Sequence, residues 1–247
     1  MRERASTAAA FAHTLAGRAL DVIRKLLIRV GAAMPGWFVD RVYRRAVAAA
    51  HLPLSGRWLA EHTGLPSVSL RDRSQVFELI ALQVTAKKVL YLEFGVYRGY
   101  SMRLWSRLID HPEALLHGFD SFEGLPENWG MTSPKGSISA MGAVPEVADP
   151  RVRFFKGWFD DTLRAYSLPA HDVLVVNLDA DVYSSARTVL NYLRDKLKPG
   201  DWLYFDEFMV WDHEFRAFQE FVEGSGMRFQ AIAEAAGYSH VAFKVAG

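Results

Sequence analysis

The segment Lys88–Gly95 constrains the fold more than any other part of this sequence. It is a short, almost continuous apolar run, and it leads into a turn with two glycines, Gly95-Val96-Tyr97-Arg98-Gly99. A strand that is buried on both faces has this composition, and such strands occur in parallel sheets that helices cover on both sides. We therefore predict a buried parallel strand here, followed directly by a helix.

Strand-like and helix-like segments alternate along the rest of the chain. Six more strands are expected, over Leu115–Phe119, Val152–Phe155, Val173–Leu178, Trp202–Phe205, Phe229–Ile232 and Val241–Val245. Helices are expected over Ser74–Ala86, Ser101–Ile109, Ala186–Lys196 and His213–Glu223. This alternation predicts a doubly wound, Rossmann-like α/β fold with a seven-stranded sheet. The last connection is too short for a crossover helix, so the last strand is expected to be antiparallel.

Residues 1–70 are predicted to form an N-terminal helical extension, and residues 71–247 the α/β domain. Apolar residues recur at steps of three and four from Leu20 to Met34, which is the period of one helical face. Pro35-Gly36 is expected to end this helix. A second helix is expected over Val39–Ala50, with Pro53 stopping it.

Charge is unevenly distributed along the chain. The first 50 residues hold nine basic and three acidic residues, although the net charge of the whole chain is only +1. So small a net charge gives no electrostatic case for a nucleic-acid partner. We expect the basic, amphipathic extension to act as a lid or a homodimer element, with an anionic membrane surface as the alternative. The chain lacks cysteine, which fits a reducing compartment, and we expect a cytoplasmic protein.

The first two strand ends favour a nucleoside ligand, because ligands of such sheets bind beyond the carboxyl ends of the strands. Gly95 and Gly99 let the backbone approach a ligand closely, but the third glycine of a nicotinamide-binding fingerprint is missing. Glu93 suits a cationic amino-acid ligand such as S-adenosylmethionine better than a pyrophosphate. Asp120 ends the second strand, where an acid can accept both ribose hydroxyls. An ordinary strand–helix turn and a turn-capping aspartate are the plainer alternatives.

The next three strand ends carry aromatic and acidic residues. Trp158 and Phe159 are placed to cover an adenine face, or else to pack in the core. The fourth and fifth strand ends present four carboxylates, Asp179, Asp181, Asp206 and Glu207. Such a group repels itself without a counter-charge, and oxygen ligands suit magnesium or calcium. Solvated loop acids, one of them a helix cap, are the alternative without a metal.

Together these motifs resemble the macrocin O-methyltransferase family, which methylates sugar hydroxyls of antibiotic and related glycosides. The resemblance covers Leu92 to about Ala217 and rests on Glu93–Gly99, Asp120–Pro126, Lys156–Phe159 with Asp161-Thr162, and Asp179–Ser184. It implies a class I methyltransferase that uses S-adenosylmethionine, depends on Mg²⁺ and takes a hydroxylated acceptor. It would assign metal ligation to Asp179 and to the pair Asp206-Glu207, where the family usually has two aspartates.

The expected function is therefore methylation of a small-molecule hydroxyl, such as that of a sugar or glycosylated natural product, with divalent metal assistance. The expected cofactor-binding residues are Glu93, Gly95, Val96, Tyr97, Gly99, Ser101, Asp120, Ser121, Trp158 and Phe159. The expected metal ligands are Asp179, Asp206 and Glu207, and Asp179 or His213 is expected to take the proton. The alternatives are a metal-independent methyltransferase on the same fold and a nucleoside-binding scaffold without chemistry.

Overall fold

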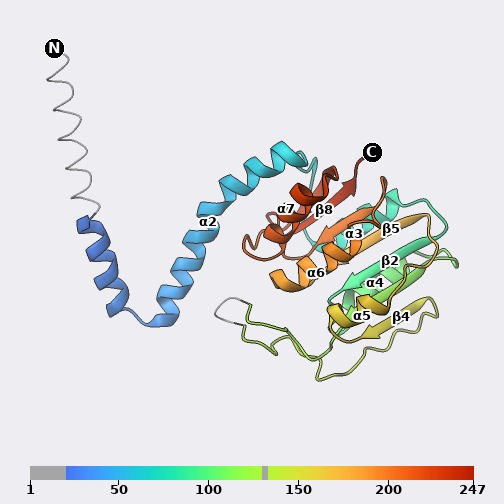
Figure 1. Ribbon diagram of the computed structural model, residues 1–247, viewed down its shortest axis with the longest axis horizontal. Coiled ribbons are helices and arrows are strands. Elements are labelled where there is room, and N and C mark those ends of the chain that lie inside the picture. Colours follow the sequence, from blue (N-terminus) through green and yellow to red (C-terminus); the bar gives the residue numbers. More distant parts are fainter. Residues whose placement is uncertain (1–20, 130–132) are drawn as a thin grey trace, which may run out of the picture. The chain divides into compact units, whose positions relative to one another are not determined.

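The computed structural model describes residues 21–129 and 133–247 (Figure 1). The chain divides into two compact units, Met1–Ala49 and Ala50–Gly247. The second unit contains the sheet and begins earlier than the predicted domain boundary at residue 70. Part of the expected helical extension therefore belongs with the sheet.

The second unit is built on an eight-stranded sheet in the order β1-β7-β8-β6-β5-β2-β3-β4. The strands are β1 (Val68–Leu70), β2 (Val89–Phe94), β3 (Leu115–Asp120), β4 (Val152–Lys156), β5 (Val173–Leu178), β6 (Trp202–Phe205), β7 (Phe229–Ala235) and β8 (His240–Val245). Strand β8 pairs antiparallel with β6 and β7, and the other pairs are parallel. The seven predicted strands and the antiparallel last strand are confirmed. The prediction omits β1, which adds an eighth strand beside β7.

Helices cover both faces of this sheet (Figure 1). They are α2 (Gly36–His62), α3 (Arg73–Gln83), α4 (Tyr100–Leu108), α5 (Phe159–Ala165), α6 (Tyr183–Leu193) and α7 (Glu214–Ser225). Helices α3 and α4 pack on one face, and α5, α6, α7 and the end of α2 pack on the other. Every residue of β2 and β6 is buried as a result, which explains their continuous apolar sequences. The sequence prediction omits α5.

The prediction that Pro53 stops a helix is wrong, because α2 continues through it to His62. Proline lacks the N–H that would bond the carbonyl four residues earlier, at Ala49. The boundary between the two compact units falls at this point of the sequence. Beyond Pro53 the helix is held by Trp58, whose ring lies 5.6 Å from that of Phe215 in α7. Tertiary packing thus outweighs the local cost of the proline.

In the first unit, a helix covers residues 21–33 and ends before Pro35, as predicted; Leu20 lies outside the described residues. Val22, Ile23, Leu26 and Leu27 are all more than half exposed on this helix. Among the described residues, no helix combines the length and the apolar character that crossing a bilayer requires.

Candidate functional site

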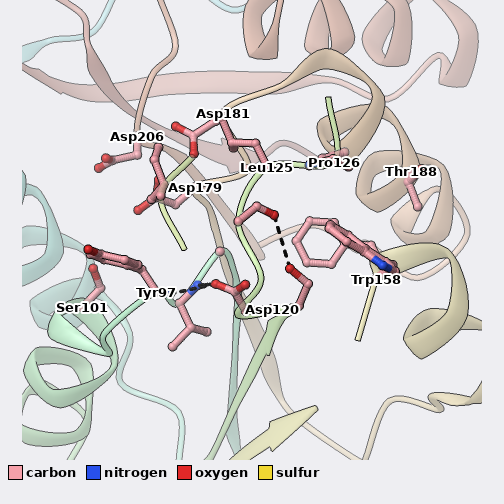
Figure 2. A pocket seen from close by; sticks show the side chains of 18 of the residues that line it. Tyr97, Ser101, Asp120, Leu125, Pro126, Trp158, Asp179, Asp181, Thr188 and Asp206 are labelled. Carbon is pink, nitrogen blue, oxygen red and sulfur yellow. Dashed lines mark hydrogen bonds between the residues drawn. The ribbon is translucent and has the colours of Figure 1, made fainter. Parts of the chain in front are cut away.

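A cavity of about 370 Å³ lies at the carboxyl ends of β2 to β6, within the second unit. Strand β2 has β3 on one side and β5 on the other, so the strand order reverses here. Open α/β sheets bind ligands at such reversals, and the volume lies within the usual range for small-molecule pockets. Figure 2 shows Asp179, Asp181 and Asp206 together on one side of this cavity, with Trp158 and Thr188 on another.

Gly95 lets the ends of β2 and β5 lie against each other. Its φ is +96°, and a Cβ placed on it would lie 1.7 Å from the carbonyl oxygen of Asp179. The N–H of Gly95 donates to the carbonyl of Phe119 (3.0 Å), and the N–H of Asp179 donates to the carbonyl of Phe94 (2.9 Å). Backbone hydrogen bonds therefore join the ends of β2, β3 and β5, and the close approach at Gly95 is possible only because glycine has no side chain.

The Asp120 carboxylate holds the glycine turn in place. Its Oδ2 accepts the N–H groups of Val96 (2.8 Å) and Tyr97 (2.7 Å), and its Oδ1 accepts that of Phe122 (2.7 Å). A carboxylate can accept about four hydrogen bonds, so one position on Oδ1 is left for a ligand. Asp120 lines the cavity, so the remaining position can accept one ribose hydroxyl, whereas the sequence prediction is that Asp120 accepts both; the ribose contact stays a prediction.

The structure brings most of the predicted cofactor-binding residues to one cavity. Those in its wall are Gly95, Val96, Tyr97, Ser101, Asp120, Ser121, Trp158 and Phe159. Trp158 is 38% exposed, whereas Phe159 also packs edge-on against Phe94 in the core, with ring centroids 5.6 Å apart. Phe159 thus packs in the core, as one alternative had it, and the adenine contact of this aromatic pair stays a prediction.

Glu93 and Gly99 are not among the residues that line the cavity. Gly99 has a φ of +74° and starts α4 behind the turn. Glu93 is buried, and its Oε2 accepts the hydroxyl of Tyr91 (2.9 Å). Burial raises the pKa of Glu93 to about 8. The predicted contact of Glu93 with a cationic ligand stays a prediction.

Glu93 makes the stability of the protein dependent on pH. Since burial raises its pKa from about 4.5 in the unfolded chain to about 8 in the folded one, ionisation opposes folding as the pH rises through this window. We expect wild type to lose roughly 2–5 kcal/mol of unfolding free energy relative to Glu93→Gln between pH 4.5 and 8.5. Urea denaturation at both pH values measures this difference. If the difference in unfolding free energy between wild type and Glu93→Gln does not change with pH, the pKa of Glu93 is not raised in the folded protein.

Asp206 and Asp179 differ in their affinity for a proton. Asp206 accepts a hydrogen bond from the Tyr204 hydroxyl at Oδ1 (2.7 Å), and Oδ1 lies 3.2 Å from Nδ1 of His240. Burial alone would raise the pKa of Asp206, but hydrogen bonds from His240 and Tyr204 outweigh it, and the pKa lies below its usual value. Burial and then the charge of Asp206 raise the pKa of Asp179 well above its usual value. Asp179 is thus the better proton acceptor of the two.

The three predicted metal ligands do not converge on one point. Across residues 21–129 and 133–247, no group of three acidic or histidine side chains is arranged to hold a metal ion. Glu207 does not line the cavity, and Nη1 of Arg73 lies 3.2 Å from Oδ2 of Asp206 and 4.0 Å from Oδ2 of Asp179. The oxygen donors suit a hard cation, but the arrangement is a carboxylate pair bridged by an arginine. It does not fit a three-ligand metal centre.

His213 also lies outside the cavity wall. Its Nδ1 accepts the N–H of Tyr183 (3.2 Å) at the start of α6. This contact orients the ring toward the α6 backbone. The predicted role of His213 as a base therefore finds no support in this geometry and stays a prediction.

Two residues of the site, Arg73 and Glu214, were not expected from the sequence. Glu214 is completely buried; its Oε1 accepts the N–H of Ala180 (3.0 Å) and its Oε2 accepts that of Glu207 (3.2 Å). It therefore joins the two loops that carry the acidic residues. The only sequence signal was an acid in the first turn of a predicted helix, which usually indicates favourable interaction with the helix dipole.

The sheet order and the cavity at its switch point define an α/β methyltransferase fold, which solved structures confirm. The O-methyltransferase NovP has a TM-score of 0.56 and 24% identity, covering 71% of this chain and 80% of its own. The calicheamicin methyltransferase CalS11 has a TM-score of 0.54 and 19% identity, covering 69% and 76%. The chain belongs to the macrocin O-methyltransferase (TylF) family, whose model matches residues 68–234.

Two curated relatives are similar over part of their length. The chain is 30% identical over 139 residues to the 8-demethyl-8-(2,3-dimethoxy-alpha-L-rhamnosyl)-tetracenomycin-C 4'-O-methyltransferase of Streptomyces olivaceus. It is 29% identical over 139 residues to the demethyldecarbamoylnovobiocin O-methyltransferase of Streptomyces niveus. Each match covers 48% of this chain and 52% of the relative. The chain thus spans about half the length of these relatives.

Proposed function

We propose that this protein transfers a methyl group from S-adenosylmethionine to a hydroxyl group of a small molecule, and that the acceptor is a sugar or glycosylated natural product. The observation that carries the proposal is the cavity at the switch point, with Asp120 and the glycine turn in its wall. Family membership supports the donor and the type of reaction. The relative from Streptomyces olivaceus, named for a rhamnosyl compound, supports the class of acceptor.

The cavity residues fit the donor as follows. Asp120 has one acceptor position left for a ribose hydroxyl, and the exposed Trp158 offers a ring face to adenine. Gly95 lets backbone approach the ligand closely. Ser101 and Ser121 add hydroxyl groups to the same wall. Bound S-adenosylmethionine supplies a methyl group on a positively charged sulfur.

We assign the proton of the acceptor hydroxyl to Asp179. Its carboxyl group lines the cavity, and its raised pKa makes it a stronger base than an ordinary aspartate. As the acceptor oxygen bonds to the methyl carbon, the carbon–sulfur bond breaks and the hydroxyl proton passes to Asp179. Orientation of the acceptor against the donor supplies much of the rate enhancement. No part of this step is assigned to the predicted Mg²⁺, and the chelator experiment described below tests whether a metal ion assists it.

Calorimetry of S-adenosylhomocysteine binding tests the donor site. We expect Asp120→Ala to bind about 100-fold more weakly than wild type, because losing hydrogen bonds to a carboxylate costs roughly 3 kcal/mol. Asp110→Ala, an exposed carboxylate outside the cavity wall, is the matched control and should bind as wild type does. Equal affinity in all three proteins would refute the assignment of Asp120.

Turnover separates the proposal from its rivals. Methyl transfer to a panel of glycosylated natural products, measured with and without a chelator, distinguishes a metal-independent enzyme from a metal-assisted one. Tight S-adenosylhomocysteine binding without turnover on any acceptor would favour the non-catalytic scaffold.

For the N-terminal helices, we propose the role of a lid or a homodimer element. The apolar side chains exposed on the helix of residues 21–33, such as Ile23 and Leu27, need a covering surface. Light scattering tests the dimer. Flotation with anionic vesicles at low salt tests the alternative of a membrane surface, which the exposed Arg24, Lys25 and Arg29 make chemically reasonable.

A further inference from the structure

Arg73 has a fixed place at the rim of the cavity. It is the first residue of α3, and the preceding Asp72 caps this helix by accepting the N–H groups of Ser74 (2.9 Å) and Gln75 (3.3 Å). The next turns of α3 anchor it to the sheet through buried side chains, including Phe77. The start of α3, capped and anchored in this way, places the Arg73 side chain beside the carboxyl ends of β5 and β6.

The guanidinium group of Arg73 is held from two sides. Nη1 donates to Oδ2 of Asp206 (3.2 Å) and lies 4.0 Å from Oδ2 of Asp179. The central carbon lies 5.1 Å from the centroid of the Tyr100 ring, within the range of a cation–π interaction. The side chain is 34% exposed, so this is a partly desolvated ion pair and not a surface contact.

Arg73 is the permanent positive charge at this carboxylate pair. Asp181 also lines the cavity, so a third carboxyl group lies in the same wall as the pair. His240 contacts only Asp206 of the pair, and it carries charge only when protonated. Arginine stays charged at all physiological pH values, and among the ion pairs of the described residues Arg73 is the one cation within 4.0 Å of both Asp179 and Asp206.

We propose that Arg73 occupies the position between Asp179 and Asp206 that a divalent cation would need, so that arginine and metal ion compete for this carboxylate pair. The proposal rests on the proposed function, since it concerns the same cavity. It explains why oxygen donors suited to a hard cation do not form a metal centre here. It also makes Arg73 the residue that sets the metal affinity of the site, because a metal ion enters only when the guanidinium leaves.

Electron paramagnetic resonance of free Mn²⁺ measures this competition on protein saturated with S-adenosylhomocysteine. We expect Arg73→Gln to bind Mn²⁺ at least about tenfold more tightly than wild type, because a like charge close to the ion is removed. Arg73→Lys, with a shorter and more mobile charge, should lie between the two. Arg98→Gln is the control: Arg98 also lines the cavity but packs over the Tyr97 ring, and its loss should leave Mn²⁺ affinity as in wild type.

Equal or weaker Mn²⁺ binding by Arg73→Gln would overturn the proposal, and so would an absence of binding by every variant. Circular dichroism melting establishes that the variants are folded; if Arg73→Gln is not, the comparison of Arg73→Lys with wild type decides. Calorimetry of S-adenosylhomocysteine on the same samples keeps the two proposals apart. If Arg73→Gln still binds S-adenosylhomocysteine and its Mn²⁺ affinity is that of wild type, only the proposed role of Arg73 is wrong. If wild type itself does not bind S-adenosylhomocysteine, the proposed function is wrong.

Discussion

Replacing Gly95 with alanine is expected to abolish S-adenosylhomocysteine binding and to lower the free energy of unfolding by about 3 kcal/mol or more. The added Cβ would lie 1.7 Å from the carbonyl oxygen of Asp179, which is backbone and cannot rotate away. The residue would also keep a φ of +96°, where side chains are strained. The ends of β2 and β5 must therefore separate, and the cavity wall with them. Calorimetry and urea denaturation measure the two effects.

Gly200→Ala is a matched control for the backbone strain. Gly200 has a φ of +98°, but a Cβ there would meet no heavy atom of the described residues within 4 Å. This variant should lose only about 1–2 kcal/mol and bind S-adenosylhomocysteine normally. If the two alanine variants are equally stable and bind equally well, the close approach of Gly95 to Asp179 has no functional importance.

Replacing Glu214 with alanine is expected to lower the free energy of unfolding by roughly 3–5 kcal/mol and to reduce methyl transfer strongly. The completely buried carboxyl group accepts the N–H groups of Ala180 and Glu207. Without it both groups lose their partner and a cavity remains. Since Ala180 follows Asp179, and Glu207 follows Asp206, the acidic residues lose their common support. Glu214→Gln keeps the volume but has one acceptor oxygen, so it should be intermediate.

Glu220→Ala is the control for Glu214, because it removes a carboxylate from the same helix. Glu220 is exposed and bonds to the Tyr183 hydroxyl and to Arg216. Surface contacts of this kind contribute less than about 1 kcal/mol. Urea denaturation of both variants compares them directly. A similar loss of stability in the two would show that Glu214 does not join the loops as described.

The central strands could be predicted from the sequence because both faces of each are buried. Strands β2 and β5 are short, nearly continuous apolar runs, and their length together with the turn residues that follow favours a buried strand over a buried helix. Strand β1, with three residues, is too short to show a period. Helix α2 passes Pro53 because of contacts with α7, and such contacts leave no local signal.

The candidate site could be predicted only where it follows the strand order. Gly95 and Asp120 end neighbouring strands, so their position in the chain indicates their position in the cavity. Arg73 meets Asp206 across 133 residues of sequence and comes from a helix that is not part of this order. The predicted metal ligands follow from the charge of the acids, their place at two adjacent strand ends and the family resemblance. The pattern of acids could not show that an arginine lies between two of them.

The two edges of the sheet limit how this protein can associate with others. An exposed strand edge is a template for strand addition by another chain, and proteins protect such edges with short strands or charged residues. Here β1, only three residues long, forms one edge, and Ser69 in it bonds to Glu234 of β7. Strand β4 forms the other and carries Arg153 and Lys156. These features disfavour strand addition at both edges, so we expect a partner, including a second copy, to be recognised through helices or loops.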